Sequence, residues 1–187
     1  MIEVEKKIQP TEEQKEKLLG GAVLISQKKV LDNYYDTLDF ELTKKNVYLR
    51  NRDGSWELKR YLDSSKRTGI AEEITDEKEI LSILGVSNFK NVDDFNEKKL
   101  KLLASIITER IKYKKDGFVI DHDKTDFDLE LFEIELIVEK ESQIIEAENK
   151  ILEYISKFGI LESKLDIKPV EYLKKVRPEI YKSIKLE

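Results

Sequence analysis

The stretch "IEVEKKI" (residues 2–8) has the alternation of a β-strand and an unusual distribution of charge. Successive side chains of a strand point to opposite faces. One face therefore carries Ile2, Val4, Lys6 and Ile8, and the opposite face carries Glu3, Glu5 and Lys7. A solvated edge strand explains three charges on one face of a single strand, so the interpretation depends on whether other strands repeat the pattern.

The composition is that of a folded protein of ordinary domain size. The chain has 187 residues, of which 39% are charged and 40% apolar. Tyr and Phe recur within apolar runs, which distinguishes the chain from a disordered one. It contains no internal repeat, low-complexity stretch or linker. We therefore expect a single domain over residues 1–187.

Charge and cysteine content exclude several classes of function. The net charge of −5 provides no basic field for a nucleic-acid backbone, which disfavours nucleic-acid binding. The absence of cysteine excludes disulfides, thiolate metal sites and a cysteine nucleophile, and it fits a reducing compartment. There is no signal-peptide pattern and no run of about 18 apolar residues. We expect a cytoplasmic monomer without a membrane or nucleic-acid partner.

Period-two patterns predict about eight strands, with helices between them. The predicted strands cover residues 2–8, 22–36, 46–52, 55–62, 68–74, 105–115, 118–124 and 129–139. Asp53-Gly54 and Asp116-Gly117 are hairpin turn signals.

Helices are predicted from a Thr11 cap to Gly20, from Thr75, within 89–103, from Ser142 to Gly159 and from Lys168. The apolar stripe of the helix from Ser142 comprises Ile144, Ile145, Ala147, Ile151, Leu152 and Ile155. The fold class is α+β: an eight-stranded antiparallel closed or nearly closed β-barrel, with helices packed outside.

Most strands repeat the charged face of residues 2–8, and the sign of the charge is sorted by strand. Acid pairs are Glu3/Glu5, Asp121/Asp123 and Glu133/Glu135, and basic pairs are Arg50/Arg52 and Arg110/Lys112. An ordinary surface mixes both signs. If the strands close into a barrel with helices covering the apolar faces, the charged faces become its lining. Unpaired buried ions cost several kcal/mol each, so such a lining requires water and a charged ligand.

The two kinds of charge predict the ligand. Arginine forks match phosphate oxygens and lysine acts as a point charge. Carboxylates without cysteine or several histidines suit Mg²⁺ or Mn²⁺ better than zinc. Carboxylates two residues apart on a strand are about 6.6 Å apart at Cα, close enough to share an ion or its waters. The sequence therefore predicts a polyphosphate bound with a divalent cation.

An ordered set of motifs along almost the whole chain resembles the CYTH superfamily, the triphosphate tunnel metalloenzymes. The motifs are "EVEKK" at 3–7, "NYYDT" at 33–37, "LRNR" at 49–52, "WELK" at 56–59, "EEIT" at 72–75, "TER" at 108–110, "DHDKTDF" at 121–127, "FEIE" at 132–135 and "KPVEYLKKVRPEIY" at 168–181. Within the superfamily, the chain looks most similar to thiamine triphosphatases.

The resemblance implies a tunnel that hydrolyses a triphosphate with Mg²⁺ or Mn²⁺. By motif position, the triphosphate oxygens would be held by Lys7, Arg50, Arg52, Lys59, Arg110 and Lys168. The metal would be held, directly or through water, by Glu3, Glu5, Glu73, Asp121, Asp123, Glu133 and Glu135, although Asp123 could equally be the partner of a basic side chain.

Further roles follow from the same resemblance. Lys59 and Tyr34 would help to activate water. Tyr48 stands where these enzymes have a Trp beside thiamine, and a Tyr can still stack on the thiazolium cation. Two residues are assigned to structure instead: His122, opposite the acids of its strand, and Trp56, under a helix. The alternatives for function are an inorganic tripolyphosphatase or nucleoside triphosphatase, a non-catalytic polyphosphate-binding module and, more distantly, an adenylate cyclase.

Overall fold

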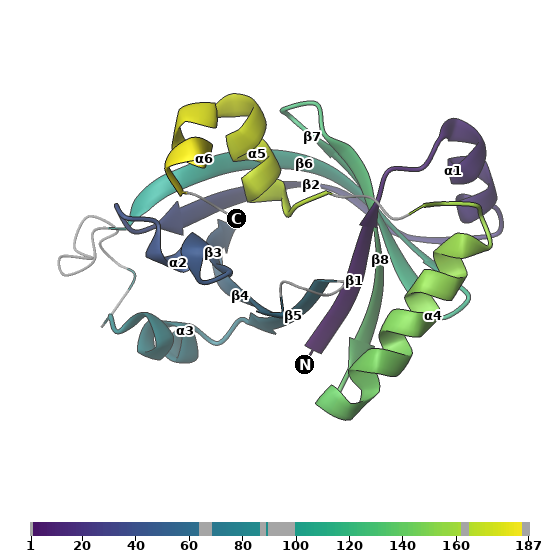
Figure 1. Cartoon of the computed structure of the whole chain (residues 1–187), viewed down its shortest axis with the longest axis horizontal. Coiled ribbons are helices and arrows are strands. Elements are labelled where there is room, and N and C mark those ends of the chain that lie inside the picture. Colours follow the sequence, from purple (N-terminus) through teal and green to yellow (C-terminus); the bar gives the residue numbers. More distant parts are fainter. Residues whose placement is uncertain (1, 64–68, 87–88, 90–99, 162–164, 185–187) are drawn as a thin grey trace. The chain divides into compact units, whose positions relative to one another are not determined.

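The computed structural model describes residues 2–63, 69–86, 89, 100–161 and 165–184 (Figure 1). Its strands are β1 (Ile2–Ile8), β2 (Val23–Asp36), β3 (Val47–Arg52), β4 (Ser55–Asp63), β5 (Gly69–Ile74), β6 (Lys101–Lys115), β7 (Phe118–Thr125) and β8 (Glu130–Val138). Its helices are α1 (Glu12–Leu19), α2 (Glu41–Lys44), α3 (Glu77–Leu84), α4 (Ile144–Ser156), α5 (Lys168–Val176) and α6 (Pro178–Ile184), with the 3₁₀ turn η2 (Glu141–Gln143) before α4.

The eight strands form one closed antiparallel ring. Their hydrogen-bonded order is β1-β5-β4-β3-β2-β6-β7-β8, and β8 pairs with β1. The two predicted hairpin turns have both residues in the left-handed region: φ is 48° at Asp53 and 95° at Gly54, and 50° at Asp116 and 87° at Gly117. This conformation matches the twist of the strands that the turns join. The predicted ring of eight antiparallel strands is confirmed.

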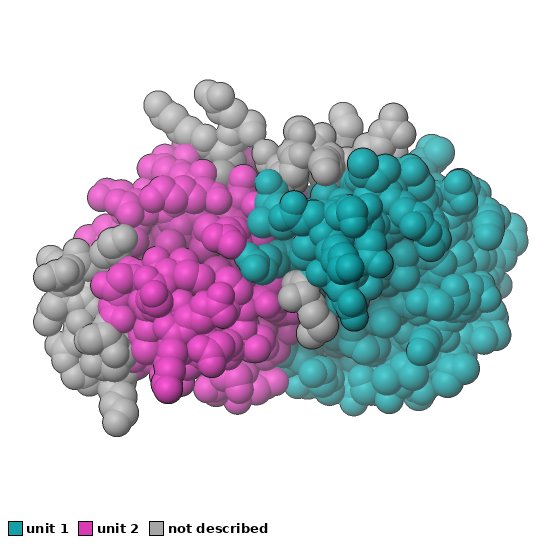
Figure 2. Space-filling view, turned by 90° about the horizontal axis from the view of Figure 1, so that it is seen from below, with its two compact units in different colours: residues 1–30, 62–72, 107–165 teal, residues 31–61, 73–106, 166–187 magenta. Residues whose placement is uncertain are grey.

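The contacts within the chain divide it into two compact units (Figure 2). Unit 1 comprises Met1–Val30, Leu62–Glu72 and Ile107–Leu165, and unit 2 comprises Leu31–Tyr61, Glu73–Ile106 and Asp166–Glu187. Each unit has its own apolar core. That residues 1–187 form a single domain stays a prediction.

The core of unit 1 lies on the apolar faces of β1, β7 and β8. Val4 and Ile8 of β1 pack with Ile120, Phe132 and Ile134. Helix α4 lies along β1 and β8 and adds Ile144, Ala147, Ile151 and Ile155, while α1 adds Leu18 (Figure 1). The alternation that places these residues in the core under the helices places the acids of the same strands on the opposite face.

One residue, Ile145, was wrongly assigned to the apolar stripe of α4. Ile145 is 68% exposed, because its position on the helix turns it away from the side that covers β1 and β8. The boundaries of α1, by contrast, follow the signals in the sequence. Thr11 and Gln14 form a capping box at the start of α1, and the helix ends at Gly20.

The core of unit 2 joins β3 and β4 to α3. Leu49 and Leu58 pack with Ile80 and Leu84 of α3. Trp56 stacks on Phe89 with ring centroids 4.3 Å apart, which agrees with its assignment to packing. Asp76 caps α3 by accepting a hydrogen bond from the Glu79 N–H, at 2.9 Å.

Two helix predictions in unit 2 need correction. Residues 101–103, expected at the end of a helix from Phe89, belong to β6, because the strand begins earlier than its alternating segment; residues 90–99 lie outside the described residues. The single helix expected from Lys168 is two helices, because Pro178 cannot continue the hydrogen bonding of α5. In the described part of the chain, no helix is both long and apolar enough to cross a membrane.

Asp36 organises the turn between β2 and α2. Its buried carboxylate accepts hydrogen bonds from the backbone N–H groups of Thr37 (2.7 Å), Leu42 (3.0 Å) and Thr43 (2.9 Å). The Thr37 hydroxyl accepts one from the Glu41 N–H, at 2.9 Å. The last two residues of the "NYYDT" motif therefore serve the backbone of this turn.

Replacing Asp36→Ala should lower the free energy of unfolding by about 3 kcal/mol, because three N–H donors lose their acceptor. Urea denaturation measures this change. Asp39→Ala, at an exposed position in the same turn, is the control and should leave the stability nearly unchanged. A loss of equal size in both variants would contradict the role given to Asp36.

Candidate metal and polyphosphate site

The charged faces of β1, β7 and β8 are buried, which rejects a solvated sheet face. Glu5 is 1% exposed, Asp121 0%, Glu133 4% and Glu135 8%. Strand register brings the carboxylates together, since Glu5 pairs with Glu135 across β1 and β8, and Asp121 pairs with Glu133 across β7 and β8. Glu3 lies on the same face of β1.

The carboxylates form two overlapping groups that could each hold a cation. Oxygens of Glu3, Glu5 and Glu135 lie within 4.8 Å of one another, and so do oxygens of Asp121, Glu133 and Glu135. Burial and the neighbouring charges of Asp121, Glu3 and Glu133 raise the pKa of Glu135 well above its ordinary value. Such mutual repulsion is relieved by a cation between the oxygens.

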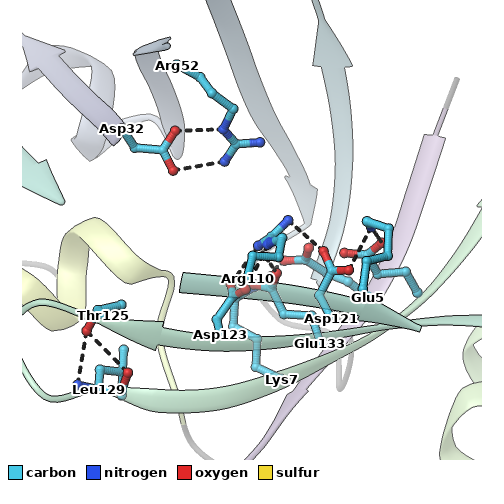
Figure 3. A network of polar contacts seen from close by, with 12 residues as sticks. Glu5, Lys7, Asp32, Arg52, Arg110, Asp121, Asp123, Thr125, Leu129 and Glu133 are labelled. Carbon is cyan, nitrogen blue, oxygen red and sulfur yellow. Dashed lines mark hydrogen bonds and ion pairs between the residues drawn. The ribbon is translucent and has the colours of Figure 1, made fainter. Parts of the chain in front are cut away.

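Three basic side chains of unit 1 pair with these acids: Arg110, Lys112 and Lys7. Arg110 binds Asp123 through Nε at 2.7 Å and Nη2 at 2.6 Å, and Nη2 also contacts Glu133 at 2.9 Å. Its Nη1 lies 2.6 Å from Asp121. Figure 3 shows this guanidinium among the three carboxylates.

The other two bases are lysines. Lys112 Nζ lies 2.7 Å from Asp121 and 3.6 Å from Glu135. Lys7 pairs with Glu5 and lies 3.7 Å from Glu133. Although both oxygens of Asp121 have a cation nearby, neither contact has hydrogen-bond geometry within the described residues.

The donor set fits a hard divalent cation. Six carboxylates and three cationic side chains lie together on these strand faces; the acids are Glu3, Glu5, Asp121, Asp123, Glu133 and Glu135. All of these donors are oxygens, and the only histidine, His122, points elsewhere, stacked on Phe132 and 2.8 Å from Glu130. Oxygen-only sites suit Mg²⁺ and Mn²⁺.

Five of the seven acids predicted to bind metal belong to these two groups: Glu3, Glu5, Asp121, Glu133 and Glu135. The other two have arginine partners. Asp123 gives both oxygens to Arg110, and Glu73, in unit 2, lies 2.8 Å from Arg50 Nη2. To bind a metal ion, Asp123 would have to release Arg110, and Glu73 would have to release Arg50.

The arginines of β3 in unit 2 are also paired with acids. Arg50 Nε donates to Glu57 at 2.7 Å. Arg52 binds Asp32 with both arms of its fork, at 2.7 and 2.9 Å. Both arginines therefore have their guanidinium planes held by carboxylates.

Sequence reasoning missed Asp32 and set Glu57 aside. Asp32 is 2% exposed and lies on the same face of β2 as the buried Tyr34 and Asp36. This alternation in the sequence could have identified Asp32 as a buried acid. Burial by itself would raise the pKa of Asp32, but the hydrogen bonds from Arg52 and the charges of Arg50, Arg52 and Lys168 lower it below its ordinary value of 3.8. Lys112 was likewise noted on its strand face but not assigned to the site.

The remaining predicted residues also lie in unit 2. Lys168 is buried at the first turn of α5. Tyr34 is buried opposite Arg50 in the β2/β3 register, and Lys59 pairs with Tyr48 in the β3/β4 register. Tyr48 packs edge-on against Tyr61, with centroids 6.0 Å apart, and Lys59 Nζ lies 5.4 Å from the Tyr61 centroid. Their assignment to water activation and substrate binding stays a prediction.

The structure is thus a closed antiparallel ring of eight strands with carboxylates clustered on one face of β1, β7 and β8. The profile of the CYTH domain matches residues 1–168. The chain belongs to the CYTH domain family.

Individual relatives are distant. A thiamine-triphosphatase from Macaca fascicularis is 27% identical, over 98% of this chain and 89% of its own length. The solved structure of the PH1819 protein from Pyrococcus horikoshii OT3 has a TM-score of 0.67 at 20% identity, over 92% of this chain and 99% of its own. A Hippeastrum protein, described as an adenylyl cyclase candidate with a dominant triphosphatase activity, has a TM-score of 0.54 at 15% identity, over 100% of this chain and 97% of its own. Both structures share the fold.

Asp32→Asn should destabilise the protein by about 2 kcal/mol at neutral pH, because a buried arginine fork loses its charged partner. A carboxyl with a lowered folded pKa contributes stability above its ordinary pKa of 3.8 and loses it as the pH falls through the folded value. The difference between the two proteins should therefore shrink below about pH 4. Urea denaturation at several pH values measures it, with exposed Asp126→Asn as control; a pH-independent difference would contradict the charge argument.

Glu135→Gln should change stability and metal binding in opposite directions. In EDTA the variant should melt about 2–4 °C higher, because one of several repelling buried carboxylates is removed. The rise in melting temperature on adding Mg²⁺ or Mn²⁺ should shrink, because a ligand is lost. Thermal denaturation with and without metal measures both effects, and exposed Glu139→Gln should behave like the unaltered chain. An undiminished metal effect in Glu135→Gln would remove this residue from the site.

Proposed function

We propose that this protein hydrolyses a triphosphate with the help of a divalent cation. The observation that carries the proposal is the cluster of carboxylates on β1, β7 and β8 in unit 1, whose oxygens form two overlapping groups that could each hold a cation. The thiamine-triphosphatase relative and the triphosphatase activity ascribed to the Hippeastrum protein support the same chemistry.

The residues divide into two roles. Carboxylates of Glu3, Glu5, Asp121, Glu133 and Glu135 would hold Mg²⁺ or Mn²⁺, which when bound neutralises phosphate oxygens and the charge that develops in the transition state. Arginines and lysines would bind phosphate oxygens: Lys7 and Arg110 in unit 1, and Arg50, Arg52, Lys59 and Lys168 in unit 2.

Water supplies the nucleophile in this proposal. Its oxygen bonds to the terminal phosphorus while the bond to the bridging oxygen breaks, so a diphosphate and inorganic phosphate leave. We assign Lys59 and Tyr34 to orienting that water, whose proton leaves with the phosphate product.

Thiamine triphosphate is the first candidate substrate, with thiamine diphosphate and phosphate as products. The relative named for this activity supports it. Inorganic tripolyphosphate is the second candidate. Tyr48 is only 7% exposed and packs edge-on against Tyr61, which leaves little of its ring for a thiazolium.

Phosphate release from thiamine triphosphate, tripolyphosphate and ATP, with Mg²⁺, Mn²⁺ or EDTA, tests the proposal. We expect metal-dependent turnover of at least one of them, with thiamine triphosphate fastest. A much higher rate on tripolyphosphate would replace the first candidate with the second. Binding without turnover of any substrate would identify a polyphosphate-binding module and overturn hydrolysis.

Arg52→Ala should lower kcat/KM on the best substrate by roughly a hundredfold or more, since a donor to the transition-state charge is lost. Arg60→Ala is the matched control, because its exposed side chain lies on the opposite face of the neighbouring strand, β4. Near-normal activity of Arg52→Ala, with the fold intact by circular dichroism, would remove Arg52 from phosphate binding.

A further inference from the structure

Thr108, on β6 in unit 1, has a buried hydroxyl without a hydrogen-bond partner among the described residues. The residue is 2% exposed. A buried hydroxyl normally finds a partner, because leaving it unsatisfied costs free energy comparable to a lost hydrogen bond. An apolar side chain of the same shape at position 108 would therefore make the folded protein more stable than Thr108 does.

The position of Thr108 relates it to the charged site. It lies two residues before Arg110, so both side chains project from the same face of β6. In the β6/β7 register Thr108 pairs with Thr125, and Arg110 pairs with Asp123. The Thr108 hydroxyl is thus at the end of the row formed by Arg110 and Lys112.

The neighbouring acceptors on β7 are already engaged. Thr125 uses its hydroxyl within its own turn, accepting from the Leu129 N–H at 3.0 Å and donating to the Leu129 carbonyl at 3.2 Å (Figure 3). Asp123 gives both oxygens to Arg110. A hydroxyl on the strand face of Arg110, whose register neighbours on β7 already have partners, suits an anionic acceptor that arrives with a ligand.

We propose that Thr108 donates a hydrogen bond to a phosphate oxygen of the bound polyphosphate, next to the contact made by Arg110. This inference rests on the proposed function and adds a neutral, directional donor to it. Hydroxyl groups contribute to phosphate recognition in this way without adding charge. Because this hydroxyl has no partner among the described residues, it lowers the stability of the protein, and the contact with phosphate offsets that loss.

Thr108→Val tests the inference because it keeps the shape of the side chain and removes the hydroxyl. In the absence of ligand the variant should melt at the same temperature or up to about 4 °C higher. Its affinity for tripolyphosphate in the presence of Ca²⁺, measured by calorimetry, should fall roughly ten- to a hundredfold. Thr108→Ser should keep most of the affinity.

Thr125→Val is the matched control on the partner strand. Its hydroxyl has protein partners, so this variant should melt at a lower temperature than the unaltered chain, opposite to Thr108→Val.

The outcomes separate the two proposals. If the unaltered chain binds tripolyphosphate and Thr108→Val binds it equally well, the role of Thr108 is overturned while the proposed function stands. A lower melting temperature for Thr108→Val would also overturn it, because the hydroxyl would then have a partner inside the protein. If the unaltered chain binds none of tripolyphosphate, thiamine triphosphate and ATP, both proposals are overturned.

Discussion

Carboxylates buried side by side repel one another, and this repulsion is the constraint on which unit 1 depends. Burial raises the free energy of each charge, and neighbouring acids raise it further. The fold accommodates the acids by placing Arg110 among Asp121, Asp123 and Glu133 and by adding Lys7 and Lys112. A sequence optimised for stability alone would have apolar residues at these positions. The acids are therefore consistent with the proposed binding of a metal ion.

The apolar cores make this charged arrangement possible. Val4, Ile120 and Ile134 alternate with the acids of their strands and pack beneath α4 and α1. The same alternation therefore determines both the core and the site. A shift of register by one residue on any of these strands would exchange the two faces, exposing apolar side chains and burying charges in the core.

Much of the fold could be predicted from sequence because its signals are local. Period-two alternation identified the strands, and Asp-Gly pairs marked hairpin turns that require left-handed backbone. Acids such as Glu5, Asp121 and Glu135 were found by the same alternation. The errors arose where local pattern is weak. Ile145 is apolar but faces solvent, and residues 101–103 read as helix although β6 already includes them. Pairings across strands could not be predicted, because Asp32 meets Arg52 only through the β2/β3 register.

The carboxylate partners of Arg50 and Arg52 have a consequence for ligand selectivity. Both of these guanidinium groups already have internal anions: Glu57 and Glu73 for Arg50, and Asp32 for Arg52. These carboxylates act as tethered competitors, present at a high effective concentration. If Arg50 and Arg52 bind phosphate as proposed, a ligand with several adjacent charges would displace these acids more readily than one with a single weak negative charge. The internal acids would then favour polyphosphates over simple anions.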